Sequence, residues 1–280
     1  MTINCSGTLI DLTIPKVMGI LNVTPNSFYD GGKYANEKQW LDQVQKMLAE
    51  GATFIDVGAY SSKPNAEFVS ELEETERLVT VVKLIVQHFP EALISVDTFR
   101  AHVARAALEA GACIVNDISA GGLDELMMKT VAEFQVPYIM MHMKGNPQTM
   151  QSLAQYNNVT KEVLFYFSEK LAQARSFGIN DLIIDPGFGF AKTTEQNFEL
   201  LANLELFDQL ELPILVGVSR KSMVYKTLET TPEFALNGTT VLNTIALQKG
   251  SNILRVHDVK EAIECVKLHQ ELSRNLETKN

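Results

Sequence analysis

Eight short apolar runs, separated by segments with helical periodicity, constrain the fold of this chain more than any other feature. The runs cover residues 17–21, 53–57, 93–96, 112–115, 137–141, 181–184, 213–218 and 252–256. Near-continuous apolar strands are typical of a parallel sheet that is buried on both faces. Eight of them alternating with helices predict an α/β fold, a single (β/α)8 TIM barrel. Such barrels carry their chemistry at the carboxyl ends of the strands.

The length of the chain fits this prediction. A barrel takes about 250 residues, the chain has 280 residues, and no linker-like stretch interrupts them. We therefore expect one domain over residues 1–280, with a short N-terminal hairpin around Ser6-Gly7 that closes the bottom of the barrel. The expected helices cover residues 37–50, 67–88, 99–110, 124–134, 159–177, 194–207 and 232–249, and a last helix starts at residue 258.

The composition excludes several classes of protein. The formal net charge of −10 argues against binding to nucleic acid or to an anionic membrane, both of which need basic surfaces. The three cysteines are far apart and show no zinc-site spacing. The chain begins with no signal-peptide pattern and has no apolar run near the ~18 residues of a membrane span. We therefore expect a cytoplasmic protein.

Polar side chains lie at or beside the ends of four predicted strands. They are Asp56, Asp97, Asn116, Asp117 and Asp185. A single one could cap a helix, but together at one mouth they can bind a flat, nitrogen-rich ring, because carboxylates accept paired N–H bonds and an amide both donates and accepts. A metal cluster is the competing interpretation, and no histidine-rich spacing favours it.

A second group of side chains near the last two strands is basic. It comprises Arg220, Lys221, Arg255 and His257, with Lys63 as a further candidate. Arg255 and His257 are two residues apart, so they face the same side of a strand. The helix expected at Asp258 offers unpaired N–H groups to an anion. This group predicts a phosphate or pyrophosphate pocket, and surface salt bridges are the alternative.

The segment Gly187-Phe188-Gly189-Phe190 follows Asp185-Pro186. Its glycines allow the backbone to approach a ligand closely, and its aromatic rings could stack on a planar group. Its spacing differs from that of a dinucleotide-binding loop. Met141, near the end of the fifth predicted strand, could fill the core and also line the pocket.

Motifs along nearly the whole chain resemble those of one family, dihydropteroate synthase. They are Val17-Met18-Gly19-Ile20-Leu21-Asn22-Val23-Thr24-Pro25, Ser27-Phe28, Asp30-Gly31-Gly32, Ile55-Asp56-Val57-Gly58, Ser95-Val96-Asp97-Thr98, Val115-Asn116-Asp117-Ile118, Met141-His142-Met143, Asp185-Pro186-Gly187-Phe188-Gly189-Phe190, Gly217-Val218-Ser219-Arg220-Lys221-Ser222 and Arg255-Val256-His257-Asp258. They follow one another in the family's order from residue 17 to residue 258.

The resemblance implies a barrel enzyme of folate biosynthesis. Its reaction joins 6-hydroxymethyl-7,8-dihydropterin pyrophosphate to p-aminobenzoate and yields 7,8-dihydropteroate and pyrophosphate. It implies pterin-binding residues Asp97, Asn116, Met141, Asp185, Phe190 and Lys221; p-aminobenzoate-binding residues Phe28, Ser62, Lys63, Pro64 and Ser222; pyrophosphate-binding residues Asn22, Arg255 and His257; and Mg²⁺ held by Asn22 and Asp30. Lys221, Arg255 and His257 are the expected catalytic residues. Dimers are common in the family, so we expect a homodimer.

The chain departs from the family's usual pattern in two loops. Asn26 stands where aspartate is usual, and residues 61–65 read Ser-Ser-Lys-Pro-Asn where Ser-Thr-Arg-Pro-Gly is usual. The second departure bears on the affinity for p-aminobenzoate and its sulfonamide mimics, because lysine lacks the planar fork of arginine. Two alternatives stay open: a methyltransferase acting on methyltetrahydrofolate, and a catalytically inactive barrel that only binds pterins.

Overall fold

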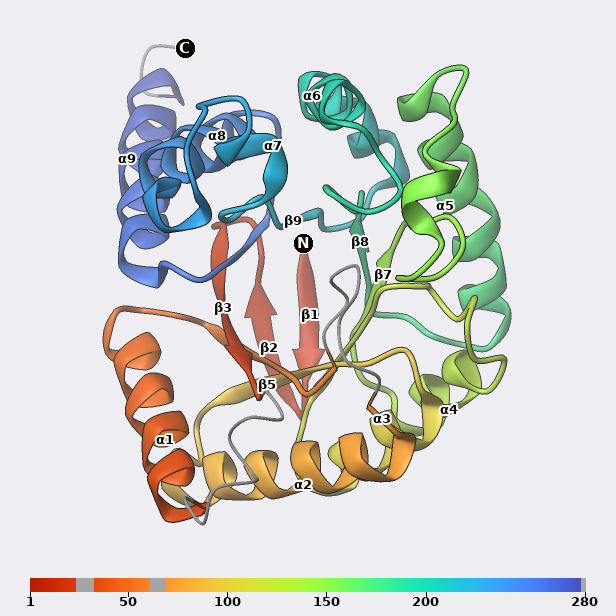
Figure 1. The fold of residues 1–280 in the computed structure, drawn as a ribbon, viewed down its shortest axis with the longest axis vertical. Helices are drawn as coiled ribbons and strands as arrows, with labels where there is room; N and C mark the ends of the chain where they lie inside the picture. The colour runs from red at the N-terminus through yellow and green to blue at the C-terminus, as the bar shows by residue number, and fades with distance from the viewer. Residues whose placement is uncertain (24–32, 61–68, 278–280) are drawn as a thin grey trace.

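In the described part of the chain, eight parallel strands form a nearly closed barrel inside a ring of helices (Figure 1). The computed structural model describes residues 1–23, 33–60 and 69–277. The strands pair in the order β8-β7-β6-β5-β4-β3-β10-β9, and a bridge between Ile184 and Ile214 joins the two edges. The predicted α/β barrel is confirmed. The strands are β3 (Lys16–Asn22), β4 (Phe54–Gly58), β5 (Leu93–Asp97), β6 (Ile114–Asp117), β7 (Tyr138–Met141), β8 (Leu182–Asp185), β9 (Leu215–Val216) and β10 (Ile253–Val256).

The helices follow the expected alternation, with several different ends. They are α1 (Lys33–Ala49), α2 (Glu71–His88), α3 (Ala101–Glu109), α4 (Met127–Phe134), α5 (Val159–Ser176), α6 (Thr194–Ala202), α7 (Ser222–Tyr225), α8 (Leu236–Gln248) and α9 (Val259–Glu277), with short 3₁₀ turns at Met150–Leu153, Leu204–Leu210 and Pro232–Phe234. None of the helices within the described residues is long and apolar enough to cross a membrane.

Local capping explains two of the differences. Helix α2 starts four residues later than predicted because Ser70 occupies its N-cap, where its hydroxyl accepts a bond from the Glu73 amide at 3.3 Å. Helix α4 starts three residues later than predicted because the Asp124 carboxylate accepts bonds from the amides of Leu126 and Ala101 at 3.0 and 2.7 Å. The aspartate therefore shapes a turn before the helix.

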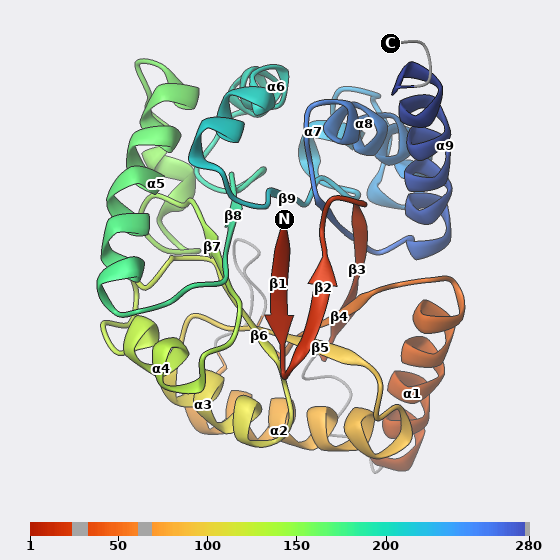
Figure 2. The same cartoon turned by 180° about the vertical axis from the view of Figure 1, so that it is seen from behind.

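The N-terminal hairpin closes one end of the barrel, as the sequence predicts. Its strands are β1 (Thr2–Cys5) and β2 (Thr8–Asp11), and they lie across the barrel in Figure 2. Its buried side chains share one apolar cluster with residues from the amino-terminal parts of the barrel strands. That cluster contains Ile3, Cys5, Leu12, Met18, Phe54, Cys113, Ile114, Ile139, Ile183, Leu215 and Ile253. The barrel interior is therefore filled by apolar side chains at this end.

Alternation along each strand sends neighbouring side chains to opposite faces. Ile114 lies in the apolar cluster inside the barrel, and Val115 belongs to the cluster between the strands and the helices. Asn116 then faces inward and Asp117 outward, where its carboxylate accepts bonds from the Tyr138 hydroxyl at 2.7 Å and the Gly121 amide at 2.6 Å. The expectation that Asp117 joins the group at the mouth is therefore wrong.

Candidate active site

The carboxyl ends of four neighbouring strands place polar residues in one row. In the pairing register, Asn22 lies beside Gly58, Gly58 beside Asp97, and Asp97 beside Asn116. Gly58 leaves space in this row, since a Cβ atom there would lie 3.4 Å from that of Asp97. Asn22 is exposed and Asn116 is buried, so the row runs from the rim into the barrel.

Arg255 joins the polar residues of this row across the barrel. Its Nε donates to Asp56 at 2.6 Å and its Nη2 donates to Asp97 at 2.7 Å. The Asn116 amide donates to the same Asp56 oxygen at 3.0 Å. Burial, offset by Arg255 and reinforced by Asp56, raises the pKa of Asp97 to about 7. The two carboxylates share one guanidinium, which favours their charged form, whereas burial and the neighbouring Asp56 favour a proton on Asp97.

Lys221 organises the other side of the mouth. Its Nζ donates to the Phe188 carbonyl at 2.5 Å and lies 4.9 Å from the centre of the Phe190 ring. Burial lowers the pKa of Lys221 to about 8, although the nearby Asp185 opposes this change. Burial raises the pKa of Asp185. Burial thus shifts the pKa of each group toward neutrality, which is common in active sites.

The two sides meet at Gly217, a residue next to β9. A Cβ atom at this position would lie 3.8 Å from both the Lys221 Nζ and the Arg255 Cβ. Met141, which is buried, packs in one apolar cluster with Phe190. Of the six residues that the resemblance assigns to the pterin, Asp97 and Asn116 thus lie beside Arg255 and Asp56. The other four lie on the Lys221 side, where Lys221 is close to Asp185 and the Phe190 ring and Met141 packs with Phe190.

His257 stands at the rim, just beyond β10. Its Nδ1 lies 3.0 Å from the Ser219 hydroxyl, which also accepts a bond from the His257 amide at 3.2 Å. Arg220, by contrast, is held by Asp258 through two bonds of 2.8 and 2.9 Å. For Arg220 the structure thus shows the salt bridge of the alternative interpretation.

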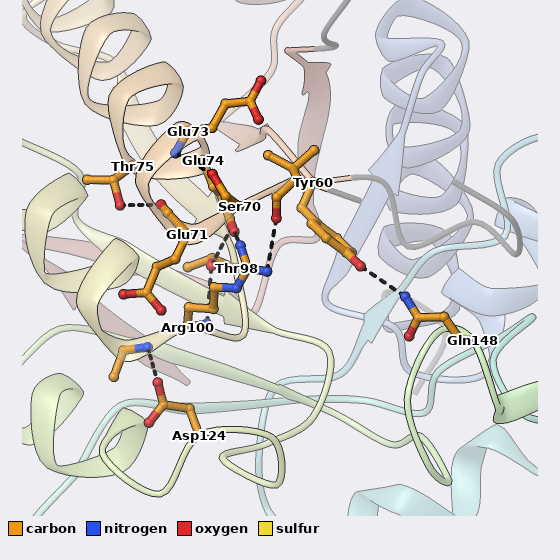
Figure 3. Close-up of polar contacts among 12 residues, drawn as sticks. Tyr60, Ser70, Glu71, Glu73, Glu74, Thr75, Thr98, Arg100, Asp124 and Gln148 are labelled. Atoms are coloured by element: carbon orange, nitrogen blue, oxygen red, sulfur yellow. Dashed lines mark hydrogen bonds and ion pairs between the residues drawn. The ribbon is translucent and has the colours of Figure 1, made fainter. Parts of the chain in front are cut away.

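A cluster of polar contacts supports the rim beside β4 and β5 (Figure 3). Arg100 donates to Glu74 at 2.5 Å and to the Val69 carbonyl at 3.1 Å, and its guanidinium lies 5.3 Å from the centre of the Tyr60 ring. The Tyr60 hydroxyl accepts a bond from Gln148 at 3.1 Å. The cluster therefore contacts the residues on either side of positions 61–68.

Several predicted site residues fall outside the described residues. They are Phe28, Asp30, Ser62, Lys63 and Pro64. Ser222 is described and is the first residue of α7, where it is partly exposed. Among the described residues there is no group of three histidine, cysteine, aspartate or glutamate side chains that could hold a metal ion. Asn22 is the one predicted metal ligand that the described residues contain.

The sequence assigned no role to three residues that support the site. Ser219 contacts His257, and Lys192 and His142 form a buried pair whose Nζ and Nδ1 atoms are 2.9 Å apart. Ser219 and His142 each directly follow a predicted strand, and this position is the sequence feature that could have identified them as site residues. Lys192 does not follow a predicted strand, and nothing in the sequence around it indicates that its side chain is buried.

Comparisons with known proteins agree with this geometry. Residues 18–257 match the family described as pterin binding enzyme. The dihydropteroate synthase of Escherichia coli K12 is 44% identical over 271 residues, which cover 96% of this chain and 95% of that protein. The structure of Yersinia pestis dihydropteroate synthase with a sulfonamide drug has a TM-score of 0.90 at 40% identity, covering 98% of this chain and 100% of that one.

A third similarity is to the Xanthomonas albilineans dihydropteroate synthase in complex with 7,8-dihydropteroate. Its TM-score is 0.86 at 34% identity, and the match covers 98% of this chain and 99% of that one. The family match, the high identity over nearly the full length and the shared fold lead to one assignment. The chain belongs to the pterin-binding enzyme family, among the dihydropteroate synthases.

Proposed function

We propose that the chain catalyses the dihydropteroate synthase reaction, the transfer of a pterin-methyl group from its pyrophosphate ester to the amine of p-aminobenzoate. The observation that carries this proposal is the constellation of Asp97, Asn116, Asp185 and Lys221 around Arg255 at the barrel mouth. The C–O bond to pyrophosphate breaks, the nitrogen of the amine forms a bond to the methylene carbon, and the amine loses one proton. No covalent enzyme intermediate is needed.

The inward carboxyl and amide groups suit the pterin. The ring presents N–H donors and ring-nitrogen acceptors, which Asp185, Asp97 and Asn116 can match. Met141 and Phe190 supply apolar walls for a flat ring. Lys221, close to both Asp185 and Phe190, would hold the ring's polar edge by donating a hydrogen bond to one of its acceptors.

Arg255 and His257 suit the leaving pyrophosphate. The Arg255 Nε and Nη2 are occupied by carboxylates, and its Nη1 has no hydrogen-bond partner among the described residues. That end of the guanidinium is therefore available for a phosphate oxygen, to which arginine binds strongly. Catalysis would come from stabilising negative charge as the C–O bond breaks.

We also propose a Mg²⁺ ion at the exposed end of β3, held by Asn22 and Asp30. Asn22 fits such a site, because Mg²⁺ commonly uses one or two protein oxygens together with water and substrate phosphates. When bound, the ion would neutralise charge on the pyrophosphate. Isothermal titration of pyrophosphate with and without Mg²⁺ tests this: the Mg²⁺-dependent gain in affinity should disappear in Asn22→Ala.

A pyrophosphate-release assay tests the main proposal. Release should require both the pterin pyrophosphate and p-aminobenzoate; a barrel that only binds pterins would release none. Asn116→Ala should weaken pterin binding, because a lost bond to a buried partner costs about 1–3 kcal/mol. Asp117→Asn is the matched control: it changes the next residue, on the outward face, and should leave pterin affinity unchanged. Equal losses in both variants would contradict the assignment.

We further propose a cytoplasmic homodimer. The dimer proposal is supported by apolar side chains exposed on α8 and α9, with Val241 49%, Leu268 74% and Leu272 52% exposed. Light scattering coupled to size exclusion should give twice the chain mass, and Leu268→Lys should shift it to the monomer. A monomeric wild-type protein would overturn the proposal. The location rests on the sequence alone, and fluorescence microscopy of a tagged chain tests it.

A further inference from the structure

Lys192 is a buried cation that the proposed mechanism does not use. Its side chain lies between the turn at residues 187–190 and the end of β7, and the residue is 5% exposed. Its Nζ donates to the Gly187 carbonyl at 2.9 Å and to the Phe190 carbonyl at 3.1 Å, and lies 2.9 Å from the His142 Nδ1. Among the described residues, no carboxylate lies within ion-pair distance of it.

The three close acceptors match the three N–H bonds of an ammonium group. The His142 Nδ1 can accept a bond from this ammonium group only in a neutral imidazole that carries its proton on Nε2. Burial and the charges of Lys192 and Lys144 keep the pKa of His142 well below its usual value, which favours this form. Burial, Lys221 and Lys144 lower the pKa of Lys192 to about 7, against the opposing effect of Asp185.

The turn that Lys192 holds carries two contacts of the pterin pocket. The Phe188 carbonyl accepts the Lys221 bond, and the Phe190 ring lies beside the same ammonium group. The turn is pressed against β7, since a Cβ atom at Gly187 would lie only 2.1 Å from the His142 carbonyl oxygen. A glycine with φ of +74° is therefore required there.

We propose that Lys192 is a positioning residue for the pterin site: its ammonium group ties residues 187–190 to His142 and thereby holds Lys221 and Phe190 in place for the ring. This inference rests on the proposed role of Lys221 in pterin binding. It assigns Lys192 no contact with p-aminobenzoate. Replacing Lys192 should therefore weaken the binding of the pterin substrate and leave the binding of p-aminobenzoate unchanged.

Lys192→Met tests the proposal, because methionine keeps most of the side-chain volume and removes every N–H donor. We expect the Kd of the pterin and the KM of the pterin pyrophosphate to rise about tenfold, as for loss of bonds from a charged group, and the KM of p-aminobenzoate to stay within twofold. Hydrogen exchange should speed up at residues 187–190. Lys170→Met, which changes a half-buried lysine on α5 near the Tyr166 ring, is the control and should leave both substrates unaffected.

The outcomes separate this inference from the function on which it rests. A folded Lys192→Met with wild-type pterin affinity, while Lys221→Met binds pterin weakly, overturns the positioning role alone. Unchanged pterin affinity in Lys221→Met overturns the pocket assignment. Equal increases in both KM values would show general structural damage and overturn the inference. If Lys192→Met does not fold, His142→Leu replaces it; this variant removes one acceptor and should raise the pterin Kd about threefold. An unchanged Kd there also overturns the inference.

Discussion

Arg255 and Lys192 are two cations beside the same pocket whose surroundings differ: the Arg255 side chain is partly buried and the Lys192 side chain is buried. Arg255 is neutralised by Asp56 and Asp97, and its environment raises its pKa further. Lys192 contacts two carbonyls and an imidazole, and its pKa is lowered to about 7. The difference shows that burial alone does not set the direction in which the pKa of a cation shifts. Neighbouring carboxylates raise the pKa of Arg255 against the effect of burial, and for Lys192 burial and neighbouring cations outweigh the opposing effect of Asp185.

Arg255 and Lys192 are also expected to contribute differently to the stability of the protein. Removing Arg255 leaves two carboxylates without their counter-ion inside the barrel, and breaking a buried ion pair from one side is costly. Removing Lys192 leaves neutral acceptors unpaired but also removes a charge that was expensive to bury. We therefore expect Arg255 to matter more for stability and Lys192 more for the order of one turn.

The largest effect on stability is expected from Arg255→Met. The free energy of unfolding, measured in urea, should fall by about 3 kcal/mol, because Asp56 and Asp97 lose their shared partner. Adding Asp97→Asn to Arg255→Met should recover part of the loss, since one unpaired charge is removed. A double variant no more stable than Arg255→Met would contradict the shared-counter-ion interpretation.

A smaller effect is expected from Lys192→Met. The free energy of unfolding at pH 7 should fall by about 1–2 kcal/mol, because three acceptors lose their donor while a buried charge disappears. Urea unfolding beside Arg255→Met, at one protein concentration, measures the difference. If the two variants lost equal stability, the distinction between the paired and the unpaired cation would fail.

The pH dependence of stability sharpens the same comparison. The pKa of Lys192 is about 7 when folded, below the ~10.4 of a free lysine. Between these values the unfolded chain binds more protons, so the contribution of Lys192 to stability increases with pH, by up to about 1.4 kcal/mol per pH unit. The gap in stability between wild type and Lys192→Met should therefore widen from pH 7 to pH 9. A constant gap would show that Lys192 keeps its proton throughout.

The smallest effect is expected from Arg220→Gln. This arginine pairs with Asp258 at the rim, where both side chains are partly exposed and water screens the charges. The free energy of unfolding should fall by about 0.5–1 kcal/mol, as for a favourable surface pair, and the Kd of the pterin should stay unchanged. Thermal unfolding and a pterin titration measure both values. A large loss of pterin affinity in Arg220→Gln would instead show that Arg220 takes part in binding.

Much of the site follows from reading the strands alone. Asp97, Asn116 and Asp185 could be named because each comes at the end of an apolar run, and barrel topology brings such ends to one mouth. The prediction for Asp117 is wrong because a strand with apolar residues on both faces shows no polar–apolar alternation in its sequence. The sequence therefore does not indicate that Asp117 faces outward. Met140 and Met141 illustrate the same ambiguity, since they belong to different apolar clusters.

By itself, the sequence determined the order of strands and helices, the hairpin and the residue types at the strand ends, because these depend on local periodicity and on neighbours within a few residues. Only the tertiary structure decided which side chains form hydrogen bonds and ion pairs with one another at the site. Asp56 and Arg255 are 199 positions apart, and Lys192 and His142 are 50 apart. Such pairs form when the barrel closes and strands from distant parts of the chain share one interior, so no local pattern records them.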